Sequence, residues 1–279
     1  MSWLREKLRR WRRFPIDGRR AEVIFCLAVG VPLTAFSIIT RIPYPVEYLQ
    51  SPPPEASPGA WTRLDQVAPI AIQATLAGED HRFHEHQGVD GVALIRGLWV
   101  AASHGRAVSG GSTITMQLVR LVQPRPRTLG GKLSELIDAC RLERAASKEE
   151  ILEQYLNRAY YGNGAWGIEA AARRYFGKSA AALTPGEGTL LAVLPRAPTT
   201  YDPYRHRDEA LARRAQVLSL MEKRGWIDGV GRAAAESQIL VLAPPGRDAP
   251  RLGQLSGRWR PLQVQVLPPA PVVQSRIVR

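Results

Sequence analysis

The chain has 279 residues, of which 45% are hydrophobic and 23% charged, and this balance excludes an intrinsically disordered protein. Its length allows one sizeable core. With 38 Lys and Arg against 25 Asp and Glu, the formal net charge is +13. We therefore expect an anionic partner, for which nucleic acid, anionic lipid and phosphorylated substrates all fit. The plainer alternative is that the excess arginine reflects genome composition and solubility.

The N-terminal part of the chain is typical of a membrane anchor. Residues 1–20 form a basic tail, and residues 21–41 contain an uncharged apolar run that is long enough to cross a bilayer as a helix. Basic residues stay on the cytoplasmic side of a membrane. We therefore expect a single-pass anchor with a cytoplasmic N-terminus and the rest of the chain on the outer side. A cleaved signal peptide is the alternative.

The remaining chain divides by composition. The proline-rich residues 42–60 predict an extended, semi-rigid linker, and residues 61–243 predict one dense helical domain. A Pro- and Arg-rich tail, 244–279, is expected to be poorly ordered, although residues 261–267 could add a short strand. Alternating strand patterns are nearly absent, so the fold is expected to be mostly α.

Helical spacing of apolar residues and capping signals predict the helices of this domain. Ser112 is the expected N-cap of one helix, because a glycine turn precedes it. The sequences 147–150 and 184–187 are capping boxes, the second with proline at the first helical position. The predicted helices cover 67–76, 90–103, 112–122, 132–145, 147–156, 167–175, a helix that opens at 184, and 205–224.

A cluster of acids and histidines follows the first of these helices. Glu79 stands where the helix gives way to a loop, and there a half-buried carboxylate can be held near the protonation midpoint that a general base needs. Asp80 beside it would raise the pKa of whichever carboxyl group is better buried. A solvated helix end is the plainer alternative for Glu79. His84 and His86 lack a third metal ligand at useful spacing, which favours a histidine that fixes the loop by hydrogen bonding.

A second signal is the glycine–hydroxyl sequence at 110–115. Two glycines followed by hydroxyl residues at a helix start can form an anion site, because free backbone N–H groups and the helix dipole point the same way. Arg120, Arg125 and Lys132 could add positive charge to the same pocket. An ordinary turn is the alternative, and no P-loop is present, because no Gly-Lys-Ser/Thr sequence follows.

A third signal is the pair Lys132 and Glu135. Three-residue spacing puts the two side chains on one face of a helix. Taken alone, the pair could be a surface ion pair that contributes little to stability.

Together these segments resemble the glycosyltransferase domain of class A penicillin-binding proteins and of monofunctional peptidoglycan glycosyltransferases. The resemblance covers roughly residues 61–226. Its motifs stand in order: Glu79-Asp80-x-x-Phe83-x-x-His86-x-Gly88, Gly110-Gly111-Ser112-Thr113-Ile114-Thr115 with Gln117, Lys132-x-x-Glu135, Tyr155-Leu156-Asn157, Tyr161-Gly162-x-Gly164, and Tyr201-Asp202-Pro203.

The resemblance implies a lysozyme-like helical domain, a membrane-associated jaw subdomain around residues 93–106 and an N-terminal transmembrane helix. It implies inverting transfer that polymerises lipid II into glycan strands and releases undecaprenyl pyrophosphate at the inner membrane. Other cell-wall synthesis proteins are expected partners, and nucleic acid is not. A divalent cation, Mg²⁺ or Mn²⁺, is expected with the pyrophosphate, and no organic cofactor is.

The resemblance also assigns roles to residues. The catalytic residues would be Glu79, which deprotonates the acceptor hydroxyl, and Glu135, which helps to position the leaving group. The substrate-binding residues would be Asp80, His86, Ser112, Thr115, Gln117, Arg120, Arg125 and Lys132.

Two positions depart from the family pattern, since Met116 stands where a glutamine is usual and Gly131 where an arginine is usual. Both departures are similar to the penicillin-binding protein 1C branch and would weaken polar contacts with the substrate. No transpeptidase motif is present, so penicillin binding is not expected of this chain. Three alternatives remain: a lytic enzyme on the same fold, a catalytically weakened scaffold derived from a truncated bifunctional protein, and a nucleic-acid-binding protein.

Overall fold

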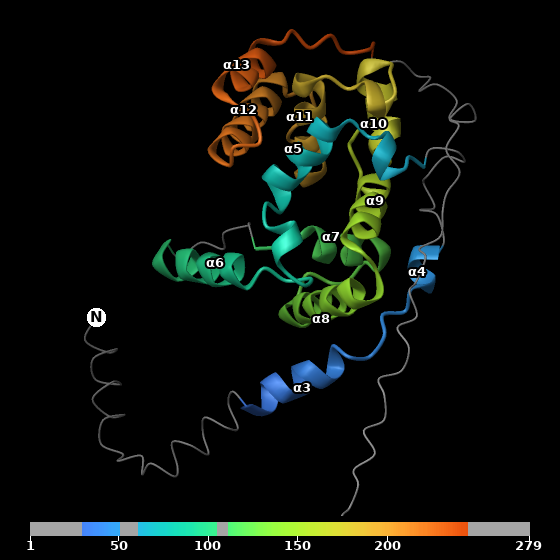
Figure 1. Ribbon diagram of the computed structural model, residues 1–279, viewed down its shortest axis with the longest axis vertical. Helices are drawn as coiled ribbons and strands as arrows, with labels where there is room; N and C mark the ends of the chain where they lie inside the picture. The colour runs from blue at the N-terminus through green and yellow to red at the C-terminus, as the bar shows by residue number, and fades with distance from the viewer. Residues whose placement is uncertain (1–29, 51–60, 105–110, 245–279) are drawn as a thin grey trace, which may run out of the picture. The chain divides into compact units, whose positions relative to one another are not determined.

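The computed structural model describes residues 30–50, 61–104 and 111–244 (Figure 1). The chain divides into two units, Met1–Ile42 and Pro43–Arg279. Within the described residues the second unit is built from helices, and its extended pairing is limited to one isolated bridge between Tyr160 and Trp166. The expectation of a mostly α fold is therefore confirmed. The tail beyond residue 244, with the strand suggested at 261–267, lies outside the described residues.

The helices follow one another with short connections. They are α3 (Val31–Ile39), α4 (Glu47–Gln50), α5 (Pro69–Glu79), α6 (Gly91–His104), α7 (Ile114–Val122), α8 (Leu129–Ala145), α9 (Lys148–Arg158), α10 (Ile168–Phe176), α11 (Pro185–Val193), α12 (Arg207–Lys223) and α13 (Gly229–Ser237), with short 3₁₀ turns η2 (Leu64–Gln66), η3 (Phe83–Glu85), η4 (Ala180–Ala182) and η5 (Leu194–Arg196).

The first unit contributes α3 alone to the described residues. None of the helices in the described part of the chain combines the length and the apolar character that crossing a bilayer requires. The anchor expected over 21–41 falls partly on residues 21–29, which lie outside the described part, so the anchor stays a prediction.

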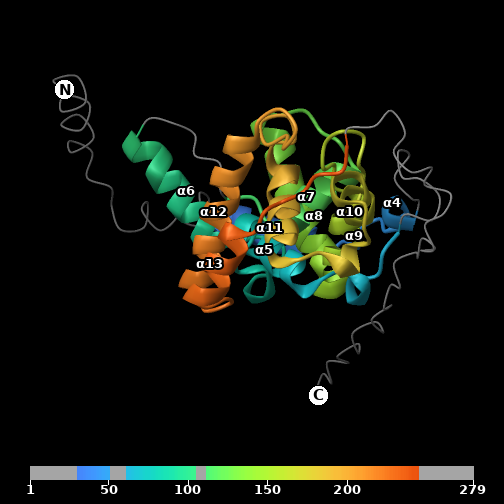
Figure 2. The same ribbon diagram turned by 90° about the horizontal axis from the view of Figure 1, so that it is seen from above.

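Two central helices, α5 and α11, form the middle of the second unit (Figures 1 and 2). They approach closely because small residues line the contact: a Cβ added to Gly188 would lie 3.1 Å from Cβ of Ala71. In both views α12 and α13 lie on one side of this pair, and α9 and α10 lie on the other. Below α5, the helices α7, α8 and α9 pack together through α7. The lower end of α5 therefore lies near the start of α7.

Capping chemistry sets most helix starts. Both capping boxes are present, with Ser147 and Glu150 at α9 and Thr184 and Glu187 at α11. The N-cap predicted for α7 is wrong by one residue, because the side chain of Thr113, not Ser112, accepts the hydrogen bond from Met116 N. The hydroxyl of Ser112 instead accepts a bond from Lys132, so this residue belongs to the site described below.

Residues 43–50 differ from the expected extended linker. Tyr44 and Leu49 are buried in the core of the second unit, and residues 47–50 form the short helix α4. Arg158 on α9 donates to the carbonyl oxygen of Leu49 at 3.1 Å, and Arg141 on α8 donates to the carbonyl oxygen of Pro43. This segment is therefore part of the domain. Residues 51–60 of the predicted linker lie outside the described residues.

Candidate active site

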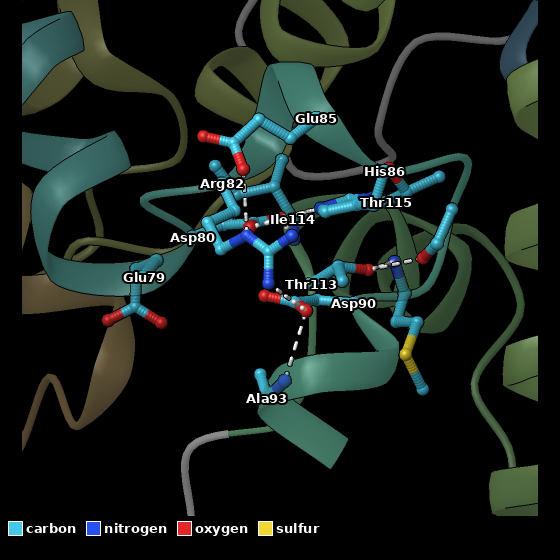
Figure 3. A network of polar contacts seen from close by, with 12 residues as sticks. Glu79, Asp80, Arg82, Glu85, His86, Asp90, Ala93, Thr113, Ile114 and Thr115 are labelled. Carbon is cyan, nitrogen blue, oxygen red and sulfur yellow. Dashed lines mark hydrogen bonds and ion pairs between the residues drawn. The ribbon is translucent and has the colours of Figure 1, made fainter. Parts of the chain in front are cut away.

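Glu79 and Asp80 are neighbours in sequence, but their carboxylates point in different directions and bind different partners. Helix α5 ends at Glu79, and Asp80 leaves the helical conformation with φ −158°. Because of this change of direction, the Glu79 carboxylate points away from the polar network that surrounds Asp80 (Figure 3). The side chain of Glu79 is 6% exposed.

Asp80 clamps three segments together. Its Oδ2 accepts a hydrogen bond from Ile114 N at the start of α7 (2.9 Å), and it lies 3.0 Å from Nε2 of His86 (Figure 3). Thr113 donates to the carbonyl oxygen of Gly88 at 2.6 Å, which ties the same loop to α7 a second time. Gly88 has φ +90°, and a Cβ there would lie 2.5 Å from the backbone of Ala139 on α8. Only glycine allows this loop to approach α8 so closely.

The neighbours of Glu79 come from four other elements. Gln117 on α7 donates from Nε2 to Oε2 of Glu79 at 3.0 Å, and Tyr155 on α9 donates to Oε1 of Gln117 at 3.2 Å. Nη1 of Arg196 lies 3.9 Å from Oε1 of Glu79, and Arg213 on α12 donates to the carbonyl oxygen of Gly78 at 3.4 Å. A carboxylate, an amide and two guanidinium groups thus meet at the end of α5.

Burial raises the pKa of Glu79 above its usual value. The hydrogen bond from Gln117 and the positive charges of Arg196, Arg213 and Arg120 oppose this rise. A carboxyl group under these competing influences has the environment expected of a general base.

A cationic cluster surrounds Glu135 on α8. Lys132 on α8 donates from Nζ to Ser112 Oγ at 2.8 Å and to Oε2 of Glu135 at 3.0 Å, and Nη1 of Arg120 lies 3.9 Å from the same Oε2. Since the charge of Arg120 also lowers the pKa of Glu79, this arginine lies within electrostatic reach of both acids. The side chains of Lys132 and Arg120 are almost half exposed, so they are open to an incoming anion.

Other predicted site residues are buried or half-buried and bond to neighbouring groups of the protein. Asp80 and His86 are buried and bound to each other, and Thr115 is fully buried and donates to Oε1 of Glu143 at 2.5 Å. Arg125 donates to Asp138 and Gln123, away from the Lys132 cluster. These four side chains hold the site in place. Nδ1 of His86 and Nη1 of Arg125 have no hydrogen-bond partner within the described residues. The substrate contact that the resemblance implies for these four residues stays a prediction.

The two departures from the family pattern have structural explanations. Met116 is 2% exposed and lies in the hydrophobic core, so its side chain does not face the cationic cluster. A Cβ added to Gly131 would lie 2.3 Å from the carbonyl oxygen of Pro126. A larger residue at 131 would therefore require the turn before α8 to move.

Sequence patterns alone did not single out Tyr155, Arg196 and Arg213 as neighbours of Glu79. They come from α9, η5 and α12, and no sequence spacing joins these elements to α5. Tyr155 stands inside a family motif, which is the signal that could have selected it. The other two follow only from the packing of α11 and α12 against α5.

A resident metal site does not fit the described residues. They contain no group of three or more His, Cys, Asp or Glu side chains placed to hold an ion, and this includes His84 and His86. Glu135 is the acid of the cationic cluster, and its Oε2 already accepts the bond from Lys132.

Comparison with known proteins identifies the family. The transglycosylase family model matches residues 48–222. The chain is similar to penicillin-binding protein 1A of Aquifex aeolicus (strain VF5), with 38% identity over 222 residues, which are 74% of this chain and 31% of that protein. It is similar to penicillin-binding protein 1A of Escherichia coli (strain K12), with 47% identity over 165 residues, 59% of this chain and 19% of that protein.

Penicillin-binding protein 1C of Escherichia coli (strain K12) is 41% identical over 204 residues, 72% of this chain and 26% of that protein. A solved structure of penicillin-binding protein 1A from Haemophilus influenzae aligns with a TM-score of 0.41 and 25% identity, over 66% of this chain and 18% of that one. The chain thus spans less than a third of the length of these relatives. Since the family model covers most of the chain, the protein belongs to the transglycosylase family, and penicillin-binding proteins are among its relatives.

Proposed function

We propose that this protein is a peptidoglycan glycosyltransferase that polymerises lipid II into glycan strands by inverting transfer, with release of undecaprenyl pyrophosphate. The observation that carries this proposal is one buried carboxylate together with a cationic cluster whose Arg120 also acts electrostatically on that carboxylate. The reaction needs both parts: a base for the attacking hydroxyl and positive charge for a departing diphosphate.

In the proposed reaction, Glu79 takes the proton from the 4-hydroxyl of the acceptor N-acetylglucosamine. The freed oxygen attacks the anomeric carbon of the donor N-acetylmuramic acid and forms the new C–O bond. The bond to the diphosphate breaks at the same carbon, and its electron pair leaves with the lipid pyrophosphate. Attack from the face opposite to the leaving group inverts the anomeric configuration.

Lys132 and Arg120 would bind the diphosphate, since charge-assisted hydrogen bonds strengthen as negative charge develops on a leaving group. Ser112 and Glu135 fix the lysine between them, with hydrogen bonds of 2.8 and 3.0 Å from its Nζ. In this role Glu135 acts on the leaving group through Lys132 and Arg120.

A divalent cation would arrive with the diphosphate. Mg²⁺ is commonly bound through substrate phosphates and one or two carboxylates, and Glu135 would be the carboxylate here. No step above depends on this ion. The test is to add EDTA to the turnover assay and then to restore Mg²⁺ or Mn²⁺. Unchanged turnover in EDTA would refute the proposed role of the cation.

Lipid II is confined to a bilayer, so the proposal places the domain at the outer face of the inner membrane. Exposed apolar side chains of α6 support this placement, since Val92, Ile95 and Trp99 share one face of that helix. The scaffold alternative loses one of its supports, because Met116 lies in the core.

The direct test is to incubate the full chain in detergent with labelled lipid II and to separate the products on a gel. We expect glycan polymers from the wild type. The Glu79→Gln variant should lose at least about 100-fold in turnover, in line with the loss of a general base, while it still folds and binds lipid II.

Glu85→Gln is the matched control, because Glu85 is an exposed acid of the same loop that pairs with Arg82. It should turn over lipid II like the wild type. Substantial polymerisation by Glu79→Gln, or equal losses in the two variants, would refute the role of Glu79 as the base.

A further inference from the structure

Gln117 lies between the carboxylate of Glu79 and the hydroxyl group of Tyr155. Its amide nitrogen donates to Oε2 of Glu79, and its amide oxygen accepts from the tyrosine hydroxyl. Tyr155 is 1% exposed, so bulk water cannot accept a hydrogen bond from its hydroxyl group. The three side chains come from α5, α7 and α9, and α7 packs against α9.

This chain of hydrogen bonds gives the amide one orientation. With the tyrosine proton on its oxygen, the amide presents its N–H to the carboxylate, which is the attractive arrangement for a deprotonated acid. Without the tyrosine hydroxyl, the amide oxygen loses a buried partner, and the amide gains freedom to turn its oxygen toward the carboxylate. That second orientation repels the deprotonated form of Glu79.

The two carboxylate oxygens of Glu79 therefore differ. Oε2 accepts the hydrogen bond from Gln117, whereas the guanidinium group of Arg196 lies 3.9 Å from Oε1, which is beyond hydrogen-bond distance.

We propose that Tyr155 is a positioning residue for the base: it holds the Gln117 amide so that the amide occupies Oε2 of Glu79, which leaves Oε1 to take the acceptor's proton. The inference deepens the proposed function and rests on it for the identity of the proton donor. In the step, the acceptor O–H bond breaks, its proton goes to Oε1, and its electron pair forms the new glycosidic bond. The bond from the anomeric carbon to the diphosphate breaks, and its electron pair leaves with the lipid pyrophosphate.

The charged groups around Glu79 set the direction of the expected effect. Arg196 of η5, Arg213 of α12 and Arg120 of α7 all favour the charged carboxylate, and burial opposes it. Burial also keeps the pKa of Tyr155 well above its usual value, so the hydroxyl stays protonated. Loss of the bond from Gln117 removes one stabilising partner of the charged form, and the pKa of Glu79 then rises.

The test measures the pKa of Glu79 directly, by NMR titration of its ¹³C-labelled carboxyl group in the full chain in detergent. In Tyr155→Phe we expect the pKa to rise by up to about one pH unit, and the acidic limb of the kcat/KM profile for lipid II to move up with it. Gln117→Met should raise the pKa at least as much, because it removes the bond itself. The double variant should show no further rise.

Tyr161→Phe is the matched control. Tyr161 is an equally buried tyrosine just beyond the end of α9, and its hydroxyl donates to the carbonyl oxygen of Leu156 at 3.5 Å instead of to Gln117. This variant should leave both the pKa of Glu79 and the pH profile where they are. A pKa in Tyr155→Phe equal to that of the wild type, or an equal rise in Tyr161→Phe, overturns the inference.

A further measurement needs no substitution. In the wild type, the Tyr155 hydroxyl proton should exchange slowly with solvent, and exchange as fast as from an exposed tyrosine would also overturn the inference. Failure of the proposed function looks different: a wild type that makes no polymer refutes the reaction, while the carboxyl titration still reports whether Tyr155 acts on Glu79 through Gln117.

Discussion

At the scale of single residues, the site depends on the separation of two adjacent acids. The Asp80 carboxylate binds the backbone N–H of Ile114 and the ring of His86, and these bonds fix the start of α7. Glu79 is left to face Gln117 and the arginines. Because Gln117 lies one turn into α7, the clamp made by Asp80 also determines where the partner of the base stands.

The buried charge of Glu79 makes a prediction about stability. Its pKa is raised in the folded protein, chiefly by burial, so its contribution to folding stability is present at low pH and is lost as the pH rises through the folded pKa. Glutamine carries no such charge. The free energy of unfolding of Glu79→Gln, relative to wild type, should therefore increase from acidic to neutral pH.

Thermal unfolding followed by circular dichroism across that pH range checks this prediction. We expect the difference in Tm between variant and wild type to grow with pH. A difference that stays constant, or that shrinks as the pH rises, would show that burial does not dominate at this carboxylate.

The sequence predicted part of this site and not the rest. A helix end at Glu79 and the one-face pairing of Lys132 with Glu135 follow from local spacing, and both are present. Sequence spacing cannot show that Asp80 binds the start of α7 while Glu79 faces Gln117. It also did not predict the hydrogen bond from Thr115 to Glu143. Those features depend on how α7 and α8 pack, which is decided by contacts far apart in the chain.

At the scale of elements, local sequence signals predicted most helix boundaries. Apolar spacing and N-terminal capping signals placed both ends of α5 to α10 and of α12, and the start of α11, within three residues of the observed positions. Helix α13 was missed because its first turn contains Gly229 and Gly231, which disfavour a helix. Asp228 offsets this by accepting a bond from Gly231 N at 2.7 Å.

The start of α8 contains two glycines with different surroundings. A Cβ at Gly131 would lie 2.3 Å from Pro126 O, whereas a Cβ at Gly130 would have its nearest neighbour at 4.0 Å. Gly130→Ala should therefore stabilise the protein by up to about 1 kcal/mol through helix propensity. Gly131→Ala should destabilise it by about 1–3 kcal/mol, because the turn at Pro126 must move.

Chemical or thermal unfolding of the two variants side by side measures this difference. Each serves as the control for the other, since both replace a glycine in the same helical turn. Equal effects at the two positions would mean that the turn before α8 yields to a side chain at little cost.

At the scale of the molecule, α6 carries an exposed apolar face. Ile95 and Trp99 are each 69% exposed and lie one turn apart. An apolar face of this kind favours contact with a lipid surface or another protein. The proposed substrate, which is held in a bilayer by its lipid chain, favours the lipid surface.

Ile95→Asp should therefore lower the turnover of lipid II embedded in vesicles by about 10-fold or more, since a charge at a lipid-facing position costs several kcal/mol. Turnover of a short-chain, water-soluble analogue should change little. Val230→Asp is the control, because Val230 is an equally exposed apolar residue on α13. Equal losses on both substrates would place the effect of Ile95 in the domain's fold.

Arg120 links the cationic cluster to the base electrostatically. Its guanidinium group lies 3.9 Å from Glu135, and its positive charge lowers the pKa of Glu79. A dianion that docks on Arg120 cancels part of that field. In the proposed reaction, arrival of the donor would therefore raise the pKa of Glu79 as the acceptor hydroxyl loses its proton. Departure of the diphosphate would lower that pKa again, which would ease the return of the proton to solvent before the next cycle.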